Sequence, residues 1–205
     1  MPMTFPAHQG LILPIVRRWP QAFDPLALSV GAAMPDLIDT LLGLSINGYF
    51  RQWYGHSLLG IFTLDMLGGL LLTWLIAISA ARFFQDSGRA QRLQSFLRRT
   101  PPKSDWAKNR TPAFPRWALS VFVGILSHIA FDLISHDTNL LFYPWYEDPR
   151  WFPEWWYATW FEIPPVPPFG HTYSGGIHTV IWGLLTIVGI LLFFQFLLSK
   201  LDKNA

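Results

Sequence analysis

The stretch Ser127–His136, SHIAFDLISH, places His128, Asp132 and His136 four residues apart within an otherwise apolar run. On an α-helix, a step of four residues advances about 400°, so these three side chains form one polar stripe. An ionisable side chain inside a membrane-spanning helix costs roughly 2.5–3.5 kcal/mol on insertion scales and is a functional hypothesis by default. The stretch therefore predicts a membrane helix that carries part of a polar site.

Long apolar runs on either side of this stretch predict several further spans. Each of the three longest approaches or exceeds the roughly 20 residues that about 30 Å of hydrocarbon requires. A weaker run at 26–44 is interrupted by Pro35. With 51% hydrophobic and 14% charged residues, we expect a single membrane domain over 1–205. The predicted fold is an all-α polytopic bundle of four to five spans with a broken or re-entrant N-terminal segment. The three longest runs are 57–81, 117–135 and 177–199.

The charge distribution predicts the topology of these spans. Nine of the fifteen Lys and Arg residues lie between Arg82 and Arg116, whereas 137–176 holds one basic residue and five acids. The positive-inside rule then places 82–116 in the cytoplasm as a basic loop and 137–176 on the outer side. We expect the basic loop to contact anionic lipid rather than nucleic acid, because no nucleic-acid-binding motif accompanies it.

This topology brings most of the histidines to one membrane face. Five of the six lie towards the outer side, and the predicted cytoplasmic loop and tail contain none. Since the topology was assigned from Lys and Arg alone, the agreement is an independent test of a shared site. The five are His56, His128, His136, His171 and His178.

Histidine and aspartate on several helices, without nearby Lys or Arg, predict a bound divalent cation. These ligand types suit Zn²⁺, Mn²⁺ or Fe²⁺ better than Ca²⁺, and the chain has no cysteine to supply a thiolate. Two simpler readings stay open. A single histidine at a helix end is often an interfacial hydrogen-bonding group, and the polar cluster can serve only to hold the helices together.

The N-terminal segment predicts an unusual path through the membrane. We expect 7–18 to dip inwards from the outer surface, with His8 near the other histidines; an interfacial amphipathic segment is the alternative. Because proline is favoured at the first helical position, Pro35 is expected to start a half-helix with Asp36 in its first turn. Asp65, nine residues beyond His56, is predicted to face the opposite side of that helix. We expect it to pair with Arg17 or Arg18, or to make a buried hydrogen bond to a neighbouring helix.

The loop 137–176 is rich in tryptophan. Five of the eleven tryptophans lie between Trp145 and Trp160. They predict an aromatic belt at the lipid headgroups, and the same loop can form a lid that grips a lipid or another amphiphile.

Four blocks of sequence carry a resemblance to a known family. They are MTFPAHQGLILPIVRR, GAAMPDLI, YGHSLLGIFTLDMLGG and SHIAFDLISH. In this order they resemble the blocks of a bacterial integral-membrane family known as domain of unknown function 4184. The resemblance implies a multi-pass protein of the bacterial inner membrane, with 137–176 in the periplasm, and implies no activity.

A more distant resemblance does imply an activity. The order His, Pro-Asp, His-Ser, His-x-x-x-Asp is similar to that of LexA-regulated membrane-bound metal-dependent hydrolases. Asp39 departs from that pattern by one position, and a His-Arg pair before the His-Ser is absent. The matching positions are His8, Asp36, His56, His128 and Asp132.

Together these features predict a metal-dependent hydrolase of the inner membrane, acting on a phosphoester-type amphiphile at the periplasmic face. The expected partners are membrane lipid and a lipid-phosphate substrate. The candidate catalytic residues are Asp36 and His136. Asp36 is expected to complete the metal's ligands or to orient one of them, and a remaining acid or His136 to act as general base or acid. The alternative is a non-enzymatic membrane protein, such as a small transporter or a metal-binding assembly factor. The expected ligands of a Zn²⁺ ion, or of Mn²⁺ or Fe²⁺, are His8, His56, His128 and Asp132.

Overall fold

Three long helices dominate the computed structural model. The parts of the chain that it describes are residues 6–45, 54–83, 113–136, 141–143, 145, 151–164 and 173–201. The expected basic loop thus lies largely outside the described residues, as does His171. The long helices are α6 (Met66–Phe83), α8 (Ala113–Ser135) and α9 (Ile177–Leu201).

The long helices confirm the three strongest predicted spans. Two short elements, α5 (Leu58–Gly60) and the π-helix η1 (Ile61–Asp65), lead directly into α6. Among the described residues, three segments are long and apolar enough to cross a membrane. Their outward faces carry exposed Phe and Leu side chains, as lipid-facing helices do. The three segments are Leu58–Ala80, Phe114–Ser135 and Ile177–Ser199.

The N-terminal region is a chain of short helices. Two of them, α1 (Ala7–Ile12) and α2 (Pro14–Arg18), are each too short to span. The next two, α3 (Pro25–Gly31) and α4 (Met34–Ser45), are bent by 43° at the break between them. The predicted break before Pro35 is therefore confirmed. Counting the bent pair as one span gives four spans in the described part of the chain, the lower of the two predicted numbers.

Local sequence accounts for where α3 begins. The side chain of Asp24 accepts a hydrogen bond from the backbone N–H of Ala27, and Pro25 occupies the first helical position. Both residue types are favoured at these places, because the cap satisfies a free N–H and proline has none to lose.

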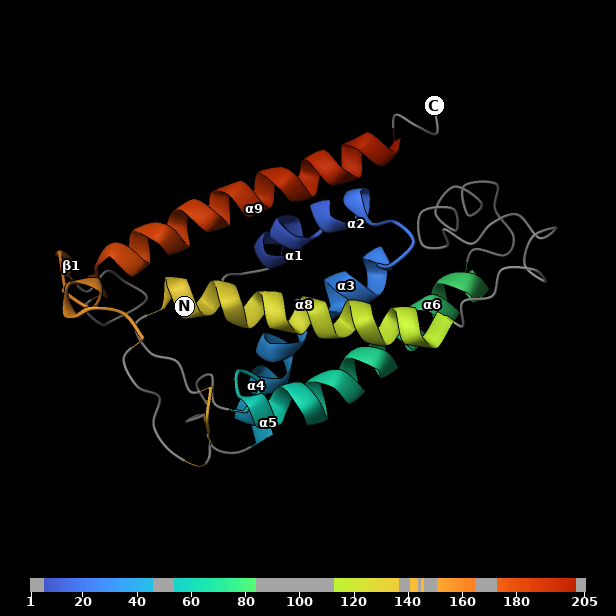
Figure 1. Ribbon diagram of the computed structural model, residues 1–205, viewed down its shortest axis with the longest axis horizontal. Coiled ribbons are helices and arrows are strands. Elements are labelled where there is room, and N and C mark those ends of the chain that lie inside the picture. The colour runs from blue at the N-terminus through green and yellow to red at the C-terminus, as the bar shows by residue number, and fades with distance from the viewer. Residues whose placement is uncertain are drawn as a thin grey trace.

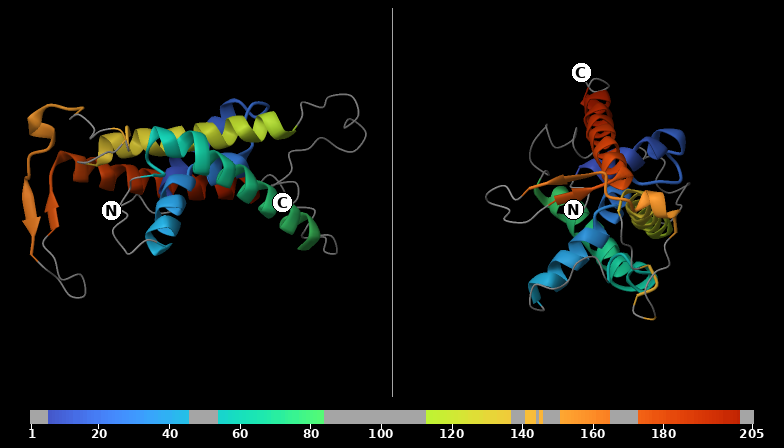
Figure 2. Two further views of the ribbon diagram at one scale, coloured as in Figure 1. Left: turned by 90° about the horizontal axis from the view of Figure 1, so that it is seen from below. Right: turned by 90° about the vertical axis from the view of Figure 1, so that its left-hand side faces the viewer.

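The short helices lie against the long ones. Helix α1 packs mainly against α9, and α3 packs mainly against α8, which runs through the middle of the molecule (Figure 1). The C-terminal ends of α6 and α9 lie at the same end of the molecule as the start of α8, whereas the C-terminal end of α8 lies near the opposite end (Figures 1 and 2). This antiparallel order is the one that the predicted topology requires.

Glycines allow two of these contacts to be unusually close. A Cβ on Gly31 of α3 would overlap the backbone of Val121, and one on Gly124 of α8 would overlap the Leu28 carbonyl. A Cβ on Gly10 of α1 would likewise overlap the Gly189 carbonyl of α9. Small residues at such crossings let membrane helices approach backbone to backbone. These contacts determine how closely α1 and α3 approach the long helices.

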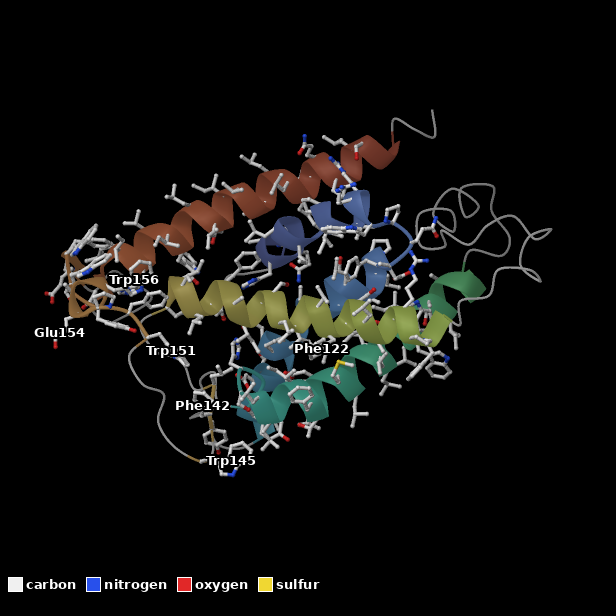
Figure 3. The ribbon with its side chains drawn as sticks, viewed as in Figure 1. Phe122, Phe142, Trp145, Trp151, Glu154 and Trp156 are labelled. Atoms are coloured by element: carbon white, nitrogen blue, oxygen red, sulfur yellow. The ribbon has the colours of Figure 1, made fainter. Side chains whose placement is uncertain are left out.

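A small hairpin departs from the predicted all-α fold. Strands β1 (Phe161–Ile163) and β2 (Tyr173–Gly175) pair antiparallel, beside the 3₁₀-helix η2 (Glu154–Trp156). The all-α fold was predicted from helical periodicity, which does not detect strands as short as these. The hairpin lies at the start of α9, and the exposed Trp145 and Trp151 lie towards the same end of the molecule (Figure 3).

The α3–α8 contact leads to a stability prediction. Gly124→Ala places a methyl group against the α3 backbone, so we expect the free energy of unfolding to fall by about 1–3 kcal/mol. Gly183→Ala is the matched control, since a Cβ there meets no atom within 4 Å. Alanine in place of a helical glycine should stabilise the control by up to about 1 kcal/mol. Thermal unfolding in detergent measures both, and equal melting temperatures would contradict the close approach.

Candidate metal centre

The polar stripe predicted on α8 faces the protein interior. His128, Asp132 and His136 are all buried, with His128 0% and Asp132 3% exposed. Side chains from three other segments meet the stripe: His8 on α1, Asp36 and Asp39 on α4, and His56 in the turn before α5. The structure thus brings together all six residues that the sequence singled out for the site.

His56 and His128 point one ring nitrogen each at the same place. Their Nε2 atoms lie 3.1 Å apart, and the ring planes are inclined by 59°. The opposite nitrogens are both occupied. His56 Nδ1 donates to Asp39 Oδ2 at 2.7 Å, and His128 Nδ1 donates to the Ala32 carbonyl at 2.8 Å. Since both partners can only accept, each histidine carries a proton on Nδ1, and its Nε2 faces the cluster.

Two carboxylates also lie close to these nitrogens. Asp132 Oδ2 lies 3.1 Å from His56 Nε2 and 3.3 Å from His128 Nε2. Asp36 Oδ1 lies 3.6 and 3.7 Å from the same two atoms. Ligand atoms bound tetrahedrally at 2.0–2.1 Å from Zn²⁺ are separated by about 3.3–3.4 Å. The distances between these side-chain atoms are therefore close to those expected between ligands of one metal ion.

The charge state of His56 shows how strongly the cluster attracts a cation. Burial acts to lower the pKa of His56, but the Asp132 and Asp39 carboxylates beside the ring prevail and raise it to about 10. In the metal-free protein, a proton therefore supplies the positive charge that the carboxylates require. A metal ion competes with that proton for the same nitrogen.

A tight turn holds His56 in place. The backbone N–H of Gly55 donates to Asp39 Oδ1 at 2.7 Å, so one carboxylate binds both the turn and the ring. A Cβ on Gly55 would overlap the Pro35 carbonyl. Ser57 then caps α5 by accepting a hydrogen bond from the Gly60 N–H. The turn before α5 is thus anchored to the first turn of α4.

His8 enters the cluster from the opposite side. It is 1% exposed, and its ring stacks on that of His128 with centroids 3.8 Å apart and planes inclined by 23°. Its Nε2 lies 3.4 Å from Asp132 Oδ1, yet neither ring nitrogen makes a hydrogen bond with any described residue. Burial lowers the pKa of His8, which leaves a neutral imidazole able to bind a metal.

The remaining histidines differ in position. His136 Nδ1 lies 3.6 Å from Asp132 Oδ1, at the edge of the cluster, and also 3.1 Å from Ser135 Oγ. His178, at the start of α9, instead donates from Nδ1 to the Trp156 carbonyl at 3.3 Å. His136 thus lies beside the cluster, whereas His178 contacts the tryptophan-rich segment 151–160 and is not part of the cluster.

Within the described residues, Asp65 lacks the partner that was predicted for it. The prediction assumed one regular helix through His56 and Asp65, but His56 precedes α5, and the π-helix η1 turns each residue through a smaller angle. Asp65 is fully buried, and its carboxylate makes no hydrogen bond within the described segments. The expected pairing with Arg17 is wrong, because Arg17 Nη2 donates instead to Ser199 Oγ at 2.8 Å.

Two groups that orient the site were missed by sequence reasoning. Asp39 holds His56, and the Ala32 carbonyl holds His128. The spacing of Asp36 and Asp39, three residues apart after a helix-starting proline, does place both carboxylates on one face of α4. No sequence signal marks the Ala32 carbonyl, since every residue has one.

Comparison with known proteins identifies one family. A family described as a domain of unknown function (DUF4184) matches residues 1–146, which include all the residues of the cluster. No curated protein and no solved structure matches the chain.

The bond between Asp39 and His56 leads to a prediction about metal affinity. Partners that orient a ligand histidine typically contribute 10–100-fold to metal affinity. We therefore expect Asp39→Asn, which keeps the shape but removes the charge, to weaken Zn²⁺ binding by about 10–100-fold in a chelator competition titration. Glu154→Gln, on the exposed η2, is the control and should bind as the wild type does. An unchanged affinity in Asp39→Asn would show that His56 is not a ligand.

Proposed function

We propose that this chain, which belongs to the family of domain of unknown function DUF4184, is a membrane-bound metal-dependent hydrolase acting on a phosphoester-type amphiphile. The proposal places the protein in the bacterial inner membrane, with the cluster towards the periplasmic face.

One observation carries the proposal: two buried imidazoles direct their Nε2 lone pairs at each other from 3.1 Å, beside a buried carboxylate. When His56 is neutral, these three groups only accept hydrogen bonds, which is strongly unfavourable in such a place unless a cation, either a proton or a metal ion, lies between them. The opposite ring nitrogens are bound to a carboxylate and a backbone carbonyl, the two commonest partners of metal-ligating histidines. The arrangement therefore supports a metal site rather than a simple helix-to-helix contact.

The ligand types narrow the choice of metal. Imidazole nitrogen with carboxylate oxygen, and without thiolate, suits Zn²⁺ first and Mn²⁺ or Fe²⁺ next. His56, His128 and Asp132 would hold the ion, and Asp36 lies within reach on its more exposed side. A divalent metal bound there would lower the pKa of water and polarise a scissile oxygen.

The protein's own residues supply the other requirements of hydrolysis. Asp36 is 27% exposed while the remaining carboxylates of the cluster are buried, so it marks the side from which a substrate enters. A carboxylate in that position can accept a proton from an attacking water. His136, 3.6 Å from Asp132 Oδ1, is a second group placed to donate or accept a proton at the edge of the cluster.

The surroundings of the cluster favour an amphiphilic substrate. The cluster lies among helices whose outward faces are apolar. Its α8 residues lie in the half of that helix nearer the hairpin of β1 and β2 (Figure 1). A substrate with an acyl chain can occupy the lipid while its headgroup meets the polar residues. The order of these residues also resembles that of the LexA-regulated membrane-bound metal-dependent hydrolases.

Metal analysis of the full chain in detergent tests the proposal. We expect about one or more equivalents of Zn²⁺ or Mn²⁺ in the wild type and a loss in both His128→Ala and Asp132→Ala. His178→Ala is the matched control, because this histidine is bound to the Trp156 carbonyl outside the cluster. Absence of metal from the wild type would end the proposal.

Activity is tested with a panel of lipid phosphates in mixed micelles. We expect hydrolysis of at least one by the metal-loaded wild type and by His178→Ala. A fall of at least ~100-fold is expected in His128→Ala, since a metal contributes several kcal/mol and about 1.4 kcal/mol corresponds to tenfold. Metal retention with no hydrolysis of any member of the panel would favour a metal-binding or transport protein.

A further inference from the structure

We propose that Asp132 bridges two metal positions: a first at His56 and His128, and a second formed by His8 on the other oxygen of the same carboxylate. This inference rests on the proposed function, because it specifies the number of ions in the same cluster and the role of each oxygen of Asp132.

His8 is the residue that a single ion leaves unexplained. Its imidazole is 1% exposed, and both ring nitrogens are buried without a hydrogen bond to the part of the chain that the structure describes. Leaving a buried polar group unpaired costs about 1–3 kcal/mol, so such a group usually has a partner of another kind. His8 Nε2 faces Asp132 Oδ1 at 3.4 Å, the separation expected of two ligands on one ion.

His8, His128 and Asp132 lie close enough together to hold one ion, but the orientation of the two rings argues against His8 and His128 sharing it. A metal bound to an imidazole lies near the plane of the ring, because the nitrogen lone pair lies in that plane. The planes of His8 and His128 are inclined by only 23° with centroids 3.8 Å apart. Such planes meet well beyond the 2.0–2.1 Å length of a metal–nitrogen bond. The stacked rings therefore direct their lone pairs side by side, towards two different points.

His56 and His128 show the contrasting arrangement. Their planes are inclined by 59° and their Nε2 atoms are 3.1 Å apart, so their lone pairs converge on one point. His128 thus belongs with His56, and His8 belongs to a separate position.

The two oxygens of Asp132 divide in the same way. Oδ2 lies against His56 and His128, at 3.1 and 3.3 Å, whereas Oδ1 lies against His8 at 3.4 Å. Neither oxygen makes a hydrogen bond. His136 Nδ1 lies 3.6 Å from Oδ1 and is the next nitrogen within reach of the second position. A carboxylate whose oxygens face two separate sets of imidazoles has the geometry of a bridging ligand.

A second ion also narrows the reaction. Pairs of ions about 3.5–4 Å apart are characteristic of phosphatases and nucleases, where they stabilise both the attacking and the leaving oxygen. Among amphiphilic substrates, a bridged pair favours those with a phosphoester linkage.

Titration of the metal-free full chain in detergent with Mn²⁺ alone tests the inference. Equilibrium dialysis should give two Mn²⁺ per wild-type chain and one in His8→Phe, which keeps a ring stacked on His128 but has no nitrogen. His178→Ala should still bind two. The electron paramagnetic resonance spectrum of the wild type should show exchange-coupled Mn²⁺, with about half the hyperfine spacing of an isolated ion, and His8→Phe should show isolated Mn²⁺. Thermal unfolding verifies that the variants are folded.

The possible outcomes separate this inference from the proposed function. No Mn²⁺ in the wild type would overturn both. One Mn²⁺ in the wild type would overturn the second position and leave the metal-dependent hydrolase intact. Two Mn²⁺ in both wild type and His8→Phe would place the second ion elsewhere and overturn the role of His8. Loss of all Mn²⁺ from folded His8→Phe would mean that His8 is a ligand of the first ion, and would likewise overturn it.

Discussion

The close approach of α3 to α8 is the constraint on which the cluster depends. Gly31 and Gly124 present no side chains where the two helices cross, so their backbones come into direct contact. That contact brings the Ala32 carbonyl at the end of α3 within 2.8 Å of His128 Nδ1. Because the carbonyl can only accept, it determines which nitrogen of His128 carries the proton and leaves Nε2 directed into the cluster. A packing interaction between small residues thus sets the chemistry of a side chain one turn away.

The buried Asp132 carboxylate imposes a second constraint on the cluster. Within the described residues, the cluster assembles several imidazoles and carboxylates, and Asp132 makes no hydrogen bond through either oxygen. In apolar surroundings such a set is stable only with compensating positive charge. The proton held by His56 provides some of that charge in the metal-free protein.

Sequence reasoning was most successful where local rules apply. The stripe on α8 follows from the helical repeat, and the break before Pro35 follows from the missing N–H and restricted backbone of proline. It was least successful where a helix departs from regular geometry. The π-helix at Ile61–Asp65 interrupts the regular helical repeat. Nothing in the apolar sequence there distinguishes the i→i+5 hydrogen bonds of a π-helix from the i→i+4 bonds of an α-helix. The hairpin of β1 and β2 was missed for a related reason, since three-residue strands carry too little periodicity to detect.

The amino-acid sequence by itself determined that this protein has long apolar helices and which polar residues they carry, because length and periodicity are local properties of the chain. Only the tertiary structure decided which of those residues meet. His56 and His128 are 72 residues apart and touch, whereas His178, assigned to the same face, binds the Trp156 carbonyl instead. The stacking of His8 on His128 and the two-sided contacts of Asp132 also depend on how helices cross. Crossing angles and depths arise from side-chain shape at long-range contacts, which no local pattern specifies.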